Sequence, residues 1–435
     1  MLDINFIRAN RQRVENAIRN KGYVDEIDLN HVLMLDDQRK ELSGQADALR
    51  QERNQISAQM KNGKPDQALI DRGKAIKKDL SEIESKLSEV ESSYIKELKT
   101  IPNVYEDDVP IGLSEDDNEV AEVVGELPQF KFEPKNHYEI GVMRDWIDKE
   151  RAAKVTGARF AYIKGDMVKL QMAIVNFVMN SLSNEEVIKE IIEKNKLTGI
   201  SSKPFTIVLP PLMLRTEMYD AMDRLEPRED RYKIEGEELW LQGSAEHVLG
   251  SMHANEIFDE KDLPVRYLGY ATSFRQEAGT YGKDMEGIIR MHQFDKLEME
   301  SFSTKETSRK EHELFVAIQR WLVEQLVLPY RVIRKCTYDI GKPDARGIDI
   351  EVWLPGQNKY RETHTADYMT DYQSRRLNTR VRRESGEVEL VHTNDATAFA
   401  LGRIMIAVIE NYQKEDGTIR IPEVLRKYLD GKETL

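Results

Sequence analysis

Between about Leu29 and Leu98, hydrophobic residues recur at alternating spacings of three and four, with lysine, glutamate and serine between them. This rhythm is the a/d pattern of a coiled coil. The apolar positions are Leu35, Leu42, Leu49 and Ile56, supported by Ala46 and Met60, and then Ile76, Leu80, Ile83, Leu87, Val90 and Tyr94. One break, Asn62-Gly63-Lys64-Pro65, ends a helix and opens a turn. We predict an antiparallel helical hairpin over residues 29–98, with arms about 45 Å long that extend away from the rest of the protein.

The sequence after residue 100 predicts a different architecture. Residues 101–134 are rich in proline and acidic clusters, so we expect an irregular linker there. Beyond it, an amphipathic helix around 170–178, strands at 265–274 and 348–354, and a buried helix at 399–409 follow without a strict βαβ rhythm. This order favours an α+β fold with a largely antiparallel sheet. We therefore divide the chain into an N-terminal domain (1–100), a linker (101–134) and a second domain (135–435).

Composition narrows the class of protein. The 435 residues exceed one ordinary domain, and 40% hydrophobic content is enough for a sizeable core. No run of 18 apolar residues occurs, and the first twenty residues are too charged for a signal peptide, so we expect a cytoplasmic protein without membrane contact. The single cysteine, Cys336, excludes an internal disulfide framework and a CxxC zinc site.

Charge is unevenly distributed along the predicted hairpin. The whole chain has a formal net charge of −14, yet residues 61–78 contain six basic and two acidic residues. The basic residues are Lys61, Lys64, Arg72, Lys74, Lys77 and Lys78. Basic side chains on a long rod can follow a phosphate backbone, which suits recognition of a folded RNA by its shape. A dimerisation rod, a plain spacer or a merely solvated face are the alternatives.

Charged residues also cluster at the ends of two predicted neighbouring strands. Phe274-Arg275-Gln276-Glu277 closes one strand, a loop from Gly279 to Gly287 follows, and Arg290-Met291-His292-Gln293-Phe294 opens the next element. Two arginines and a carboxylate are costly to bury unless each has a partner of opposite charge or a hydrogen bond. A triphosphate would be such a partner for the arginines. A structural ion-pair cluster is the alternative. Because the chain lacks a P-loop and a GxGxxG fingerprint, side chains must hold any nucleotide. His247 and His253 are poorly spaced for metal binding, and we interpret both as structural.

These segments resemble the three motifs of class II aminoacyl-tRNA synthetases. Motif 1 would span about 170–213, with VLPP at 208–211, motif 2 about 266–298 and motif 3 about 395–413. More closely, the chain resembles the seryl-tRNA synthetase family over nearly its full length. The resemblance rests on the hairpin, on FRQEAGTYGKDMEGIIRMHQFDKLE at 274–298, on EVWLPGQNKYRE at 351–362, on DYQSRRLNTR at 371–380 and on ALGRIMIAVIENYQ at 400–413.

The resemblance implies ATP-dependent attachment of serine to tRNA(Ser) through a seryl-adenylate, and it leaves open the serylation of selenocysteine tRNA. It implies catalytic roles for Arg275, Arg290 and Arg403. Arg275 would hold the α-phosphate and the serine carboxylate, and Arg290 would bind the outer phosphates. Glu277 would accept a hydrogen bond from the adenine amino group. Phe294 would stack on one face of adenine, and Arg403 would cover the other face. Glu362 and Thr365 would coordinate Mg²⁺. A homodimer built on motif 1 is also implied.

The residues expected to form the serine pocket are where this sequence departs from the usual family pattern. By analogy, Glu298 and Thr397 would bind the serine hydroxyl, while Ser244 and Glu246 would handle the ammonium group. The family usually has T-x-E where this chain has Ser244-Ala245-Glu246, and N-G-S where it has Asp395-Ala396-Thr397. Asp395 therefore adds a carboxylate near the pocket.

Two other functions compete with this one. The first is a paralogue that activates a small amino acid for a carrier protein or another acceptor, and the retained hairpin argues against it. The second is a non-catalytic, synthetase-like RNA-binding protein. The presence of Arg275, Glu277, Arg290, Glu362 and Arg403 argues against that alternative.

Overall fold

A computed structural model describes residues 1–61, 66–278 and 286–435, which form two compact units, Met1–Val104 and Tyr105–Leu435. The predicted turn at 62–65, with Lys64, and most of the loop predicted from Gly279 lie outside the described residues. Within the described ranges, no helix is both long and apolar enough to cross a membrane.

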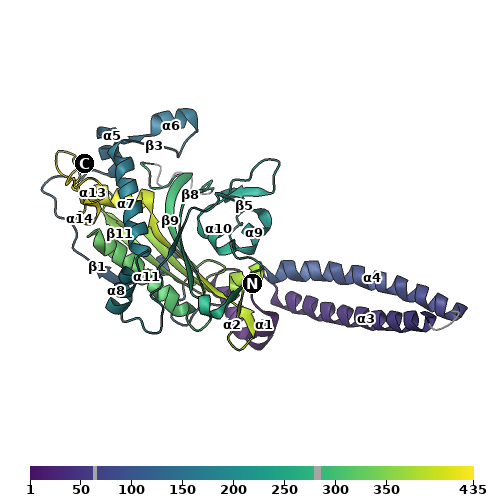
Figure 1. Cartoon of the computed structure of the whole chain (residues 1–435). Coiled ribbons are helices and arrows are strands. Elements are labelled where there is room, and N and C mark those ends of the chain that lie inside the picture. Colours follow the sequence, from purple (N-terminus) through teal and green to yellow (C-terminus); the bar gives the residue numbers. More distant parts are fainter. Residues whose placement is uncertain (62–65, 279–285) are drawn as a thin grey trace. The chain divides into compact units, whose positions relative to one another are not determined.

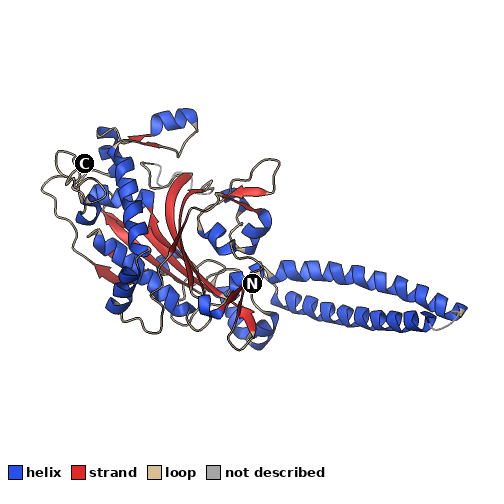
Figure 2. Ribbon diagram, viewed as in Figure 1, coloured by secondary structure: helices blue, strands red, loops and turns tan. Residues whose placement is uncertain are grey.

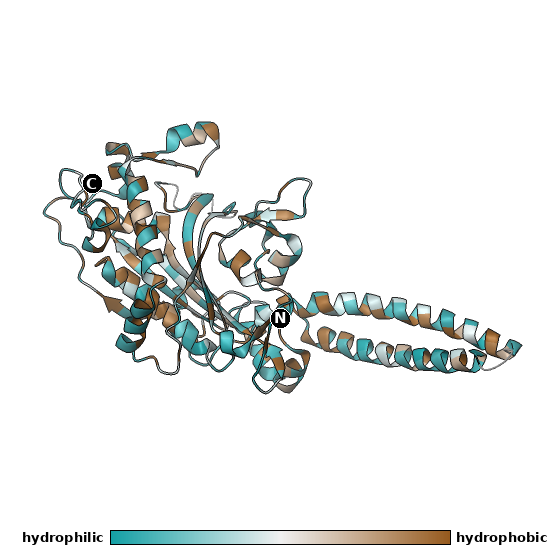
Figure 3. Cartoon of the chain, in the orientation of Figure 1, coloured by the Kyte–Doolittle hydropathy of each residue, from teal (hydrophilic) through white to brown (hydrophobic). Residues whose placement is uncertain are grey.

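The first unit is a helical hairpin on a small helical base (Figure 1). The base contains α1 (Ile4–Ala9) and α2 (Arg11–Asn20), and the hairpin consists of α3 (Leu29–Lys61) and α4 (Gln67–Leu98). Hydrophobic residues are interspersed with hydrophilic ones along both long helices (Figure 3). The buried residues of the hairpin include Leu35, Ala46 and Ile56 from α3 and Ile76, Leu80, Leu87 and Tyr94 from α4. The predicted a/d positions thus form the seam, and the helical hairpin is confirmed.

Polar contacts fix the base of this hairpin. Asp36 is fully buried on α3 and forms ion pairs with Arg8 of α1 at 2.8 Å, with Arg39 at 2.9 Å and with Lys40 at 2.6 Å. Burial alone would favour the neutral acid, but these three cations lower the pKa of Asp36 to about 2. Arg39 also lies over the ring of Tyr94, 5.1 Å from its centre. The base therefore ties α1, α3 and α4 together.

The second unit is built on an eight-stranded sheet in the order β1-β10-β11-β12-β15-β9-β8-β4 (Figure 2). Its neighbouring strands are antiparallel except β4 and β8, which confirms the predicted α+β fold with a largely antiparallel sheet. The strands are β1 (Glu119–Val124), β4 (Thr206–Val208), β8 (Val265–Phe274), β9 (Gln293–Ser303), β10 (Tyr330–Arg334), β11 (Arg346–Leu354), β12 (Lys359–Thr370) and β15 (His392–Ala400).

Smaller sheets and helices complete this unit. The minor strands are β2 (Ile147–Asp148), β3 (Tyr162–Ile163), β5 (Met213–Arg215), β6 (Leu239–Leu241), β7 (Ile257–Asp259), β13 (Arg380–Arg382) and β14 (Val388–Leu390). The α-helices are α5 (His137–Met143), α6 (Lys149–Val155), α7 (Asp166–Leu182), α8 (Glu185–Lys194), α9 (Thr216–Ala221), α10 (Glu246–Ser251), α11 (Ser308–Gln325), α12 (Tyr372–Leu377), α13 (Leu401–Asn411) and α14 (Glu423–Arg426).

Two predicted elements differ from the structure. The stretch predicted as an irregular linker contains β1, which pairs with β10 at the edge of the main sheet. Its residues are mostly exposed, so it lacks the buried, alternating pattern that marks an interior strand. The helix predicted from residue 399 begins at Leu401, because Phe399 and Ala400 continue the β15 ladder opposite Leu297 and Lys296.

The two faces of the main sheet have opposite character. On β9, Leu297 and Met299 point into the large hydrophobic core, which α11 and α13 also line, whereas Lys296, Glu298 and Glu300 point to the other face. The register extends this polar face sideways: Thr397 lies opposite Glu298, Asp395 opposite Glu300, Asp367 opposite Asp395, and Asp349 opposite Thr365. Helix α10 packs against this second face through contacts with β8, β9 and β15 (Figure 1). The sheet thus presents a row of buried polar side chains on one face.

Candidate active site

A pocket opens at the end of this polar face. Arg275, Phe294 and Arg403 all line it, although they come from the end of β8, from β9 and from α13. Its lining also includes five other residues singled out from the sequence: Glu277, Arg290, Glu362, Thr365 and Thr397. The chain therefore brings one set of cationic, acidic and aromatic side chains to a single cavity.

Arg275 is fixed by its backbone and its side chain. Its backbone N–H donates to the carbonyl of His292 at 2.9 Å, which continues the pairing of β8 and β9 beyond the strand ends. Its Nε donates to the carbonyl oxygen of Gly243 at 2.9 Å, and its guanidinium lies 5.4 Å from the centre of the Phe294 ring. The position of Arg275 in the pocket therefore depends on the Gly243 backbone and on Phe294.

Glu277 and Arg290 form an ion pair in the pocket wall. Arg290 Nη1 lies 2.5 Å from Glu277 Oε2. Glu277 has a φ of 53°, which is unusual for a residue with a side chain. The ion pair considered from the sequence is thus present, and both of its members also line the cavity.

Glu362 and Arg403 are in direct contact in the pocket wall. Arg403 Nη1 lies 3.1 Å from Glu362 Oε1 and donates to the Glu362 carbonyl oxygen at 2.8 Å. Burial opposes the charged form of this half-exposed carboxylate, but Arg403, Lys335 and Arg275 together outweigh it and hold the pKa of Glu362 below its ordinary value. Thr365 supplies a hydroxyl to the same cavity. The carboxylate of Glu362 and the hydroxyl of Thr365 are hard oxygen donors of the kind that Mg²⁺ prefers. Among the described residues, no cluster of three or more His, Cys, Asp or Glu could hold a metal ion.

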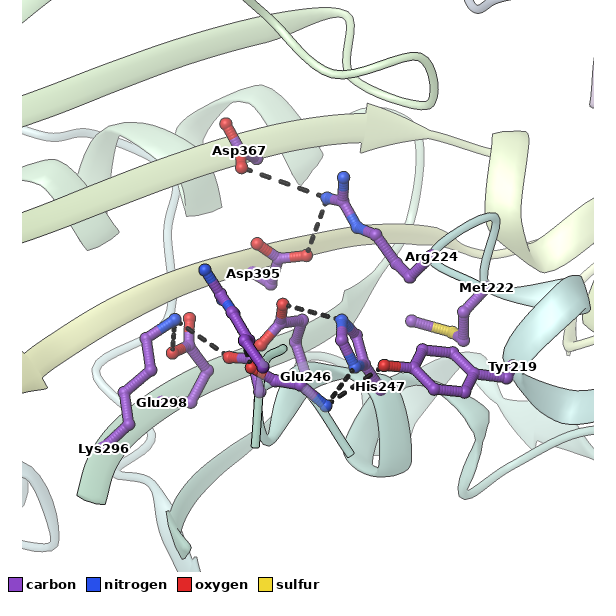
Figure 4. Close-up of polar contacts among 12 residues, drawn as sticks. Tyr219, Met222, Arg224, Glu246, His247, Lys296, Glu298, Asp367 and Asp395 are labelled. Atoms are coloured by element: carbon purple, nitrogen blue, oxygen red, sulfur yellow. Dashed lines mark hydrogen bonds and ion pairs between the residues drawn. The ribbon is translucent and has the colours of Figure 1, made fainter. Parts of the chain in front are cut away.

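The predicted serine-binding residues connect to the cavity through Lys296, which the sequence reasoning did not assign (Figure 4). Lys296 Nζ donates to Ser244 Oγ at 2.9 Å and pairs with Glu298 Oε2 at 2.5 Å. Ser244, Glu246 and Glu298 are all buried and do not line the cavity themselves. The alternation of charges at 296, 298 and 300 on one strand was a signal that could have revealed Lys296.

Two buried carboxyl groups of this cluster have pKa values that move in opposite directions. Burial raises the pKa of Glu298 to about 8, with a further contribution from the charge of Glu246 and with Lys296 opposing. For Glu246 burial also opposes ionisation, but Lys296 and His247 prevail and hold its pKa well below the ordinary value. Near neutral pH the site therefore combines a charged carboxylate with a carboxyl group that can hold a proton.

Asp395 has a counter-ion that the sequence did not reveal. Arg224, which follows α9, places Nη2 3.1 Å from Asp344. The same nitrogen lies 3.6 Å from Asp395 and 4.0 Å from Asp367 (Figure 4). Burial raises the pKa of Asp367 to about 7 and that of Asp395 well above its ordinary value. The extra carboxylate noticed at position 395 thus belongs to a group of three acids around one arginine.

The basic residues predicted to bind RNA lie on the hairpin of the first unit. Lys61, Arg72, Lys74, Lys77 and Lys78 are exposed there. Arg72 also binds Glu52 of the other helix through two hydrogen bonds of 2.7 and 2.8 Å, so it helps to hold the two helices together. Lys64 lies outside the described residues.

Comparisons with known proteins match both units. The family model for the seryl-tRNA synthetase N-terminal domain matches residues 1–105, and the tRNA synthetase class II core domain (G, H, P, S and T) matches residues 230–412. A serine–tRNA ligase from Syntrophotalea carbinolica is 38% identical, and one from Nitrosopumilus maritimus is 35% identical, each over 100% of both chains.

Solved structures agree with the sequence matches. The crystal structure of seryl-tRNA synthetase from Pyrococcus horikoshii complexed with ATP has a TM-score of 0.89 at 37% identity, covering 100% of this chain and 99% of the other. The cytoplasmic serine-tRNA ligase from Naegleria fowleri in complex with AMP has a TM-score of 0.82 at 25% identity, covering 100% and 98%. Over its whole length, this chain belongs to the seryl-tRNA synthetase family of class II aminoacyl-tRNA synthetases.

Proposed function

We propose that this chain attaches serine to tRNA(Ser) with the energy of ATP at the cavity lined by Arg275, Phe294 and Arg403. An oxygen of the serine carboxylate attacks the α-phosphorus, the bond to the bridging oxygen breaks, and pyrophosphate leaves. The ribose hydroxyl at the end of the tRNA then attacks the acyl carbon and displaces AMP. The convergence of three arginines, a phenyl ring and two acidic side chains on one cavity, in a chain of this family, carries the proposal.

Arg275 would align the two reacting groups in the first step. Negative charge builds up on the α-phosphate oxygens as the serine carboxylate approaches, and a fixed guanidinium stabilises that charge. The bond to Gly243 and the stacking on Phe294 hold Arg275 in place before substrate arrives. Phe294 and Arg403 would enclose adenine, Glu277 would accept from its amino group, and Arg290 would bind the outer phosphates.

Glu362 and Thr365 would hold Mg²⁺. The charged state of Glu362 and the hydroxyl of Thr365 suit this hard cation, which usually takes few protein ligands and fills its shell with phosphate oxygens and water. When bound, the ion would draw charge from the phosphate oxygens. The relative from Pyrococcus horikoshii was solved with ATP, which supports ATP as a substrate here.

Serine would bind over the buried cluster around Lys296. Glu246, which stays charged, would attract the ammonium group, with Ser244 beside it. Glu298 and Thr397 lie opposite each other on adjacent strands and would both contact the serine hydroxyl. Alanine would leave these polar groups without a partner, which disfavours it strongly.

The hairpin of the first unit would bind tRNA(Ser), and two chains would form a homodimer. Exposed lysines on the hairpin support the first proposal, because they can contact phosphates without reading bases. Exposed apolar residues in and beside the predicted motif 1 support the second: Met172 and Leu209 lie within it, and Val168 precedes it, one turn before Met172 on α7. We place the enzyme in the cytoplasm, where its substrates would be.

Pyrophosphate exchange into ATP tests the active-site proposal. We expect exchange with serine among the twenty amino acids, and its loss in Arg275→Ala. Arg215→Ala is a matched control, because Arg215 is exposed and pairs only loosely with Glu217 at 3.6 Å. Unchanged exchange in Arg275→Ala would refute the assigned role.

Deletion of residues 30–98 tests the proposed function of the hairpin. The second unit has its own core, so we expect exchange to persist while tRNA charging is lost. Equal loss of both activities would mean that the hairpin is needed for folding and not for tRNA binding alone.

A further inference from the structure

Helix α10 carries a buried histidine beside the proposed serine pocket that the catalytic proposal leaves without a role. His247 is 3% exposed, and its ring packs against that of Tyr219 with 4.8 Å between the ring centres. Both side chains point toward the Gly243 backbone (Figure 4). From the sequence we interpreted His247 as structural, but its contacts indicate a more specific function.

The hydrogen bonds of His247 define its tautomer. The backbone N–H of Gly243 donates to His247 Nδ1 at 3.2 Å, and an N–H group can only donate, so Nδ1 carries no proton. In the neutral ring the proton must then be on Nε2, which faces Glu246 Oε1 at 3.2 Å. Protonation at Nδ1 would break the bond to Gly243. Burial, with Arg231 and Arg224 adding to it and Glu246 opposing, lowers the pKa of His247 to about 4, so the neutral ring persists at physiological pH.

The same glycine that His247 holds also anchors Arg275. The carbonyl oxygen of Gly243 accepts from Arg275 Nε at 2.9 Å, while its N–H is shared between His247 Nδ1 and Tyr219 Oη at 3.1 Å. His247 therefore contacts Glu246 through Nε2 and is linked to Arg275 through the backbone of Gly243. In the proposed function, which this inference assumes, Glu246 binds the ammonium group of serine and Arg275 binds its carboxylate.

We propose that His247 is a positioning residue that fixes the spacing between the Glu246 carboxylate and the Arg275 guanidinium, and so orients the α-amino acid end of serine. It contacts neither substrate itself. The close packing around Gly243 supports a fixed spacing, because a Cβ at this position would lie only 3.1 Å from Tyr219 Oη and 3.2 Å from the His247 ring. The groups that bind the ammonium and carboxylate ends of serine would thus both be positioned by the backbone of Gly243.

Four single variants and one double variant test this proposal by serine-dependent pyrophosphate exchange. His247→Phe keeps the ring but removes both polar contacts, so we expect the KM for serine to rise roughly tenfold or more, because a bond to a charged group is lost. We expect a smaller rise in the KM for ATP, since only one of the two displaced groups would contact ATP. His247→Asn keeps an acceptor near the Nδ1 position and His247→Gln keeps a donor near Nε2, so each should recover part of the loss.

Tyr219→Phe supplies the matched control. It leaves His247 as an acceptor for the Gly243 N–H, so we expect less than a threefold effect on kcat/KM for serine. In the double variant with His247→Phe, that N–H is buried with no acceptor, and the loss should exceed the product of the two single losses.

Three outcomes would overturn the proposal. These are a KM for serine within twofold of the wild type in His247→Phe, an equal rise in both KM values, and multiplicative losses in the double variant. If His247→Phe does not fold, the Asn and Gln variants decide: both would have to raise the KM for serine more than that for ATP. Absence of exchange in the wild-type enzyme would instead refute the proposed function.

Discussion

Replacing Arg224 with methionine should destabilise residues 105–435 by about 3 kcal/mol at pH 8. The Arg224 side chain is 17% exposed and lies close to three acids, with distances of 3.1 Å to Asp344, 3.6 Å to Asp395 and 4.0 Å to Asp367. Methionine keeps much of the apolar stem but removes the charge.

The magnitude follows from removing one partner of a largely buried ion pair. Such changes cost about 3–5 kcal/mol, and the partial exposure of Arg224 places this one at the low end. The loss should depend on pH. Without Arg224 the pKa of Asp367, already raised to about 7, and that of Asp395 should rise further. At pH 6 Asp367 and Asp395 take up protons and so avoid part of the cost. At pH 8 they must either ionise without the charge of Arg224 or keep a proton that the unfolded chain would release to the solvent. The destabilisation should therefore be larger at pH 8.

Urea unfolding followed by tryptophan fluorescence measures this effect. All four tryptophans, Trp146, Trp240, Trp321 and Trp353, belong to the second unit, so the signal does not report on the helical hairpin. Arg228→Met is the control in the same loop. Arg228 and Glu226 form an ion pair at 2.9 Å whose side chains are 57% and 68% exposed, so we expect a change within about 0.5 kcal/mol.

A loss below about 1 kcal/mol for Arg224→Met at pH 8 would show that the three acids do not depend on this arginine. An equal loss at pH 6 and pH 8 would show that they do not take up protons in its absence. Either result would refute the electrostatic reasoning.

Three further predictions concern pH, nucleotide and tRNA. The pKa of Asp349 is raised to about 8, mainly by burial, so the folded state holds a proton that the unfolded chain has lost, and stability should fall from pH 7 to pH 8. Asp349→Asn should reduce this slope in urea unfolding, and an unchanged slope would contradict the assignment. Phe294→Ala should raise the KM for ATP in pyrophosphate exchange about tenfold, because a stacked base is worth about 1–3 kcal/mol, and an unchanged KM would exclude stacking. The double substitution Lys74→Glu and Lys78→Glu should lower the affinity for tRNA and make that affinity less dependent on salt, without affecting pyrophosphate exchange. A wild-type affinity that does not change with salt would contradict phosphate binding by the hairpin.

Much of the fold could be predicted because its elements carry periodic apolar patterns. The heptad spacing from Leu35 to Tyr94 gave both long helices, and the strand at 265–274 was placed correctly. The edge strand β1 was missed because residues such as Val120 and Val123 are exposed and interspersed with acids, as in a loop. The start of α13 was misplaced because Phe399 is apolar and buried in either conformation.

The site was predictable only where residues belong to local motifs. Arg275 and Phe294 lie within one hairpin, and their sequence context indicated a shared cavity before the structure placed them together. Arg224 could not be found in this way, because its partner Asp344 lies 120 residues away in the chain and only the tertiary fold brings them together. The function inferred for His247 depends on hydrogen bonds to the backbone of Gly243, which no side-chain pattern reveals.

The alternation along β9 also restricts how the gene can change. Deleting or inserting one residue between Lys296 and Glu300 would reverse the faces of the strand on one side of the change. An apolar side chain such as Leu297 would then point to the polar face, or a charged one such as Glu298 into the hydrophobic core. Compensation would require a matching shift in β15 and β8 at once. Gains and losses of single codons should therefore be tolerated in connecting segments and selected against within these three strands.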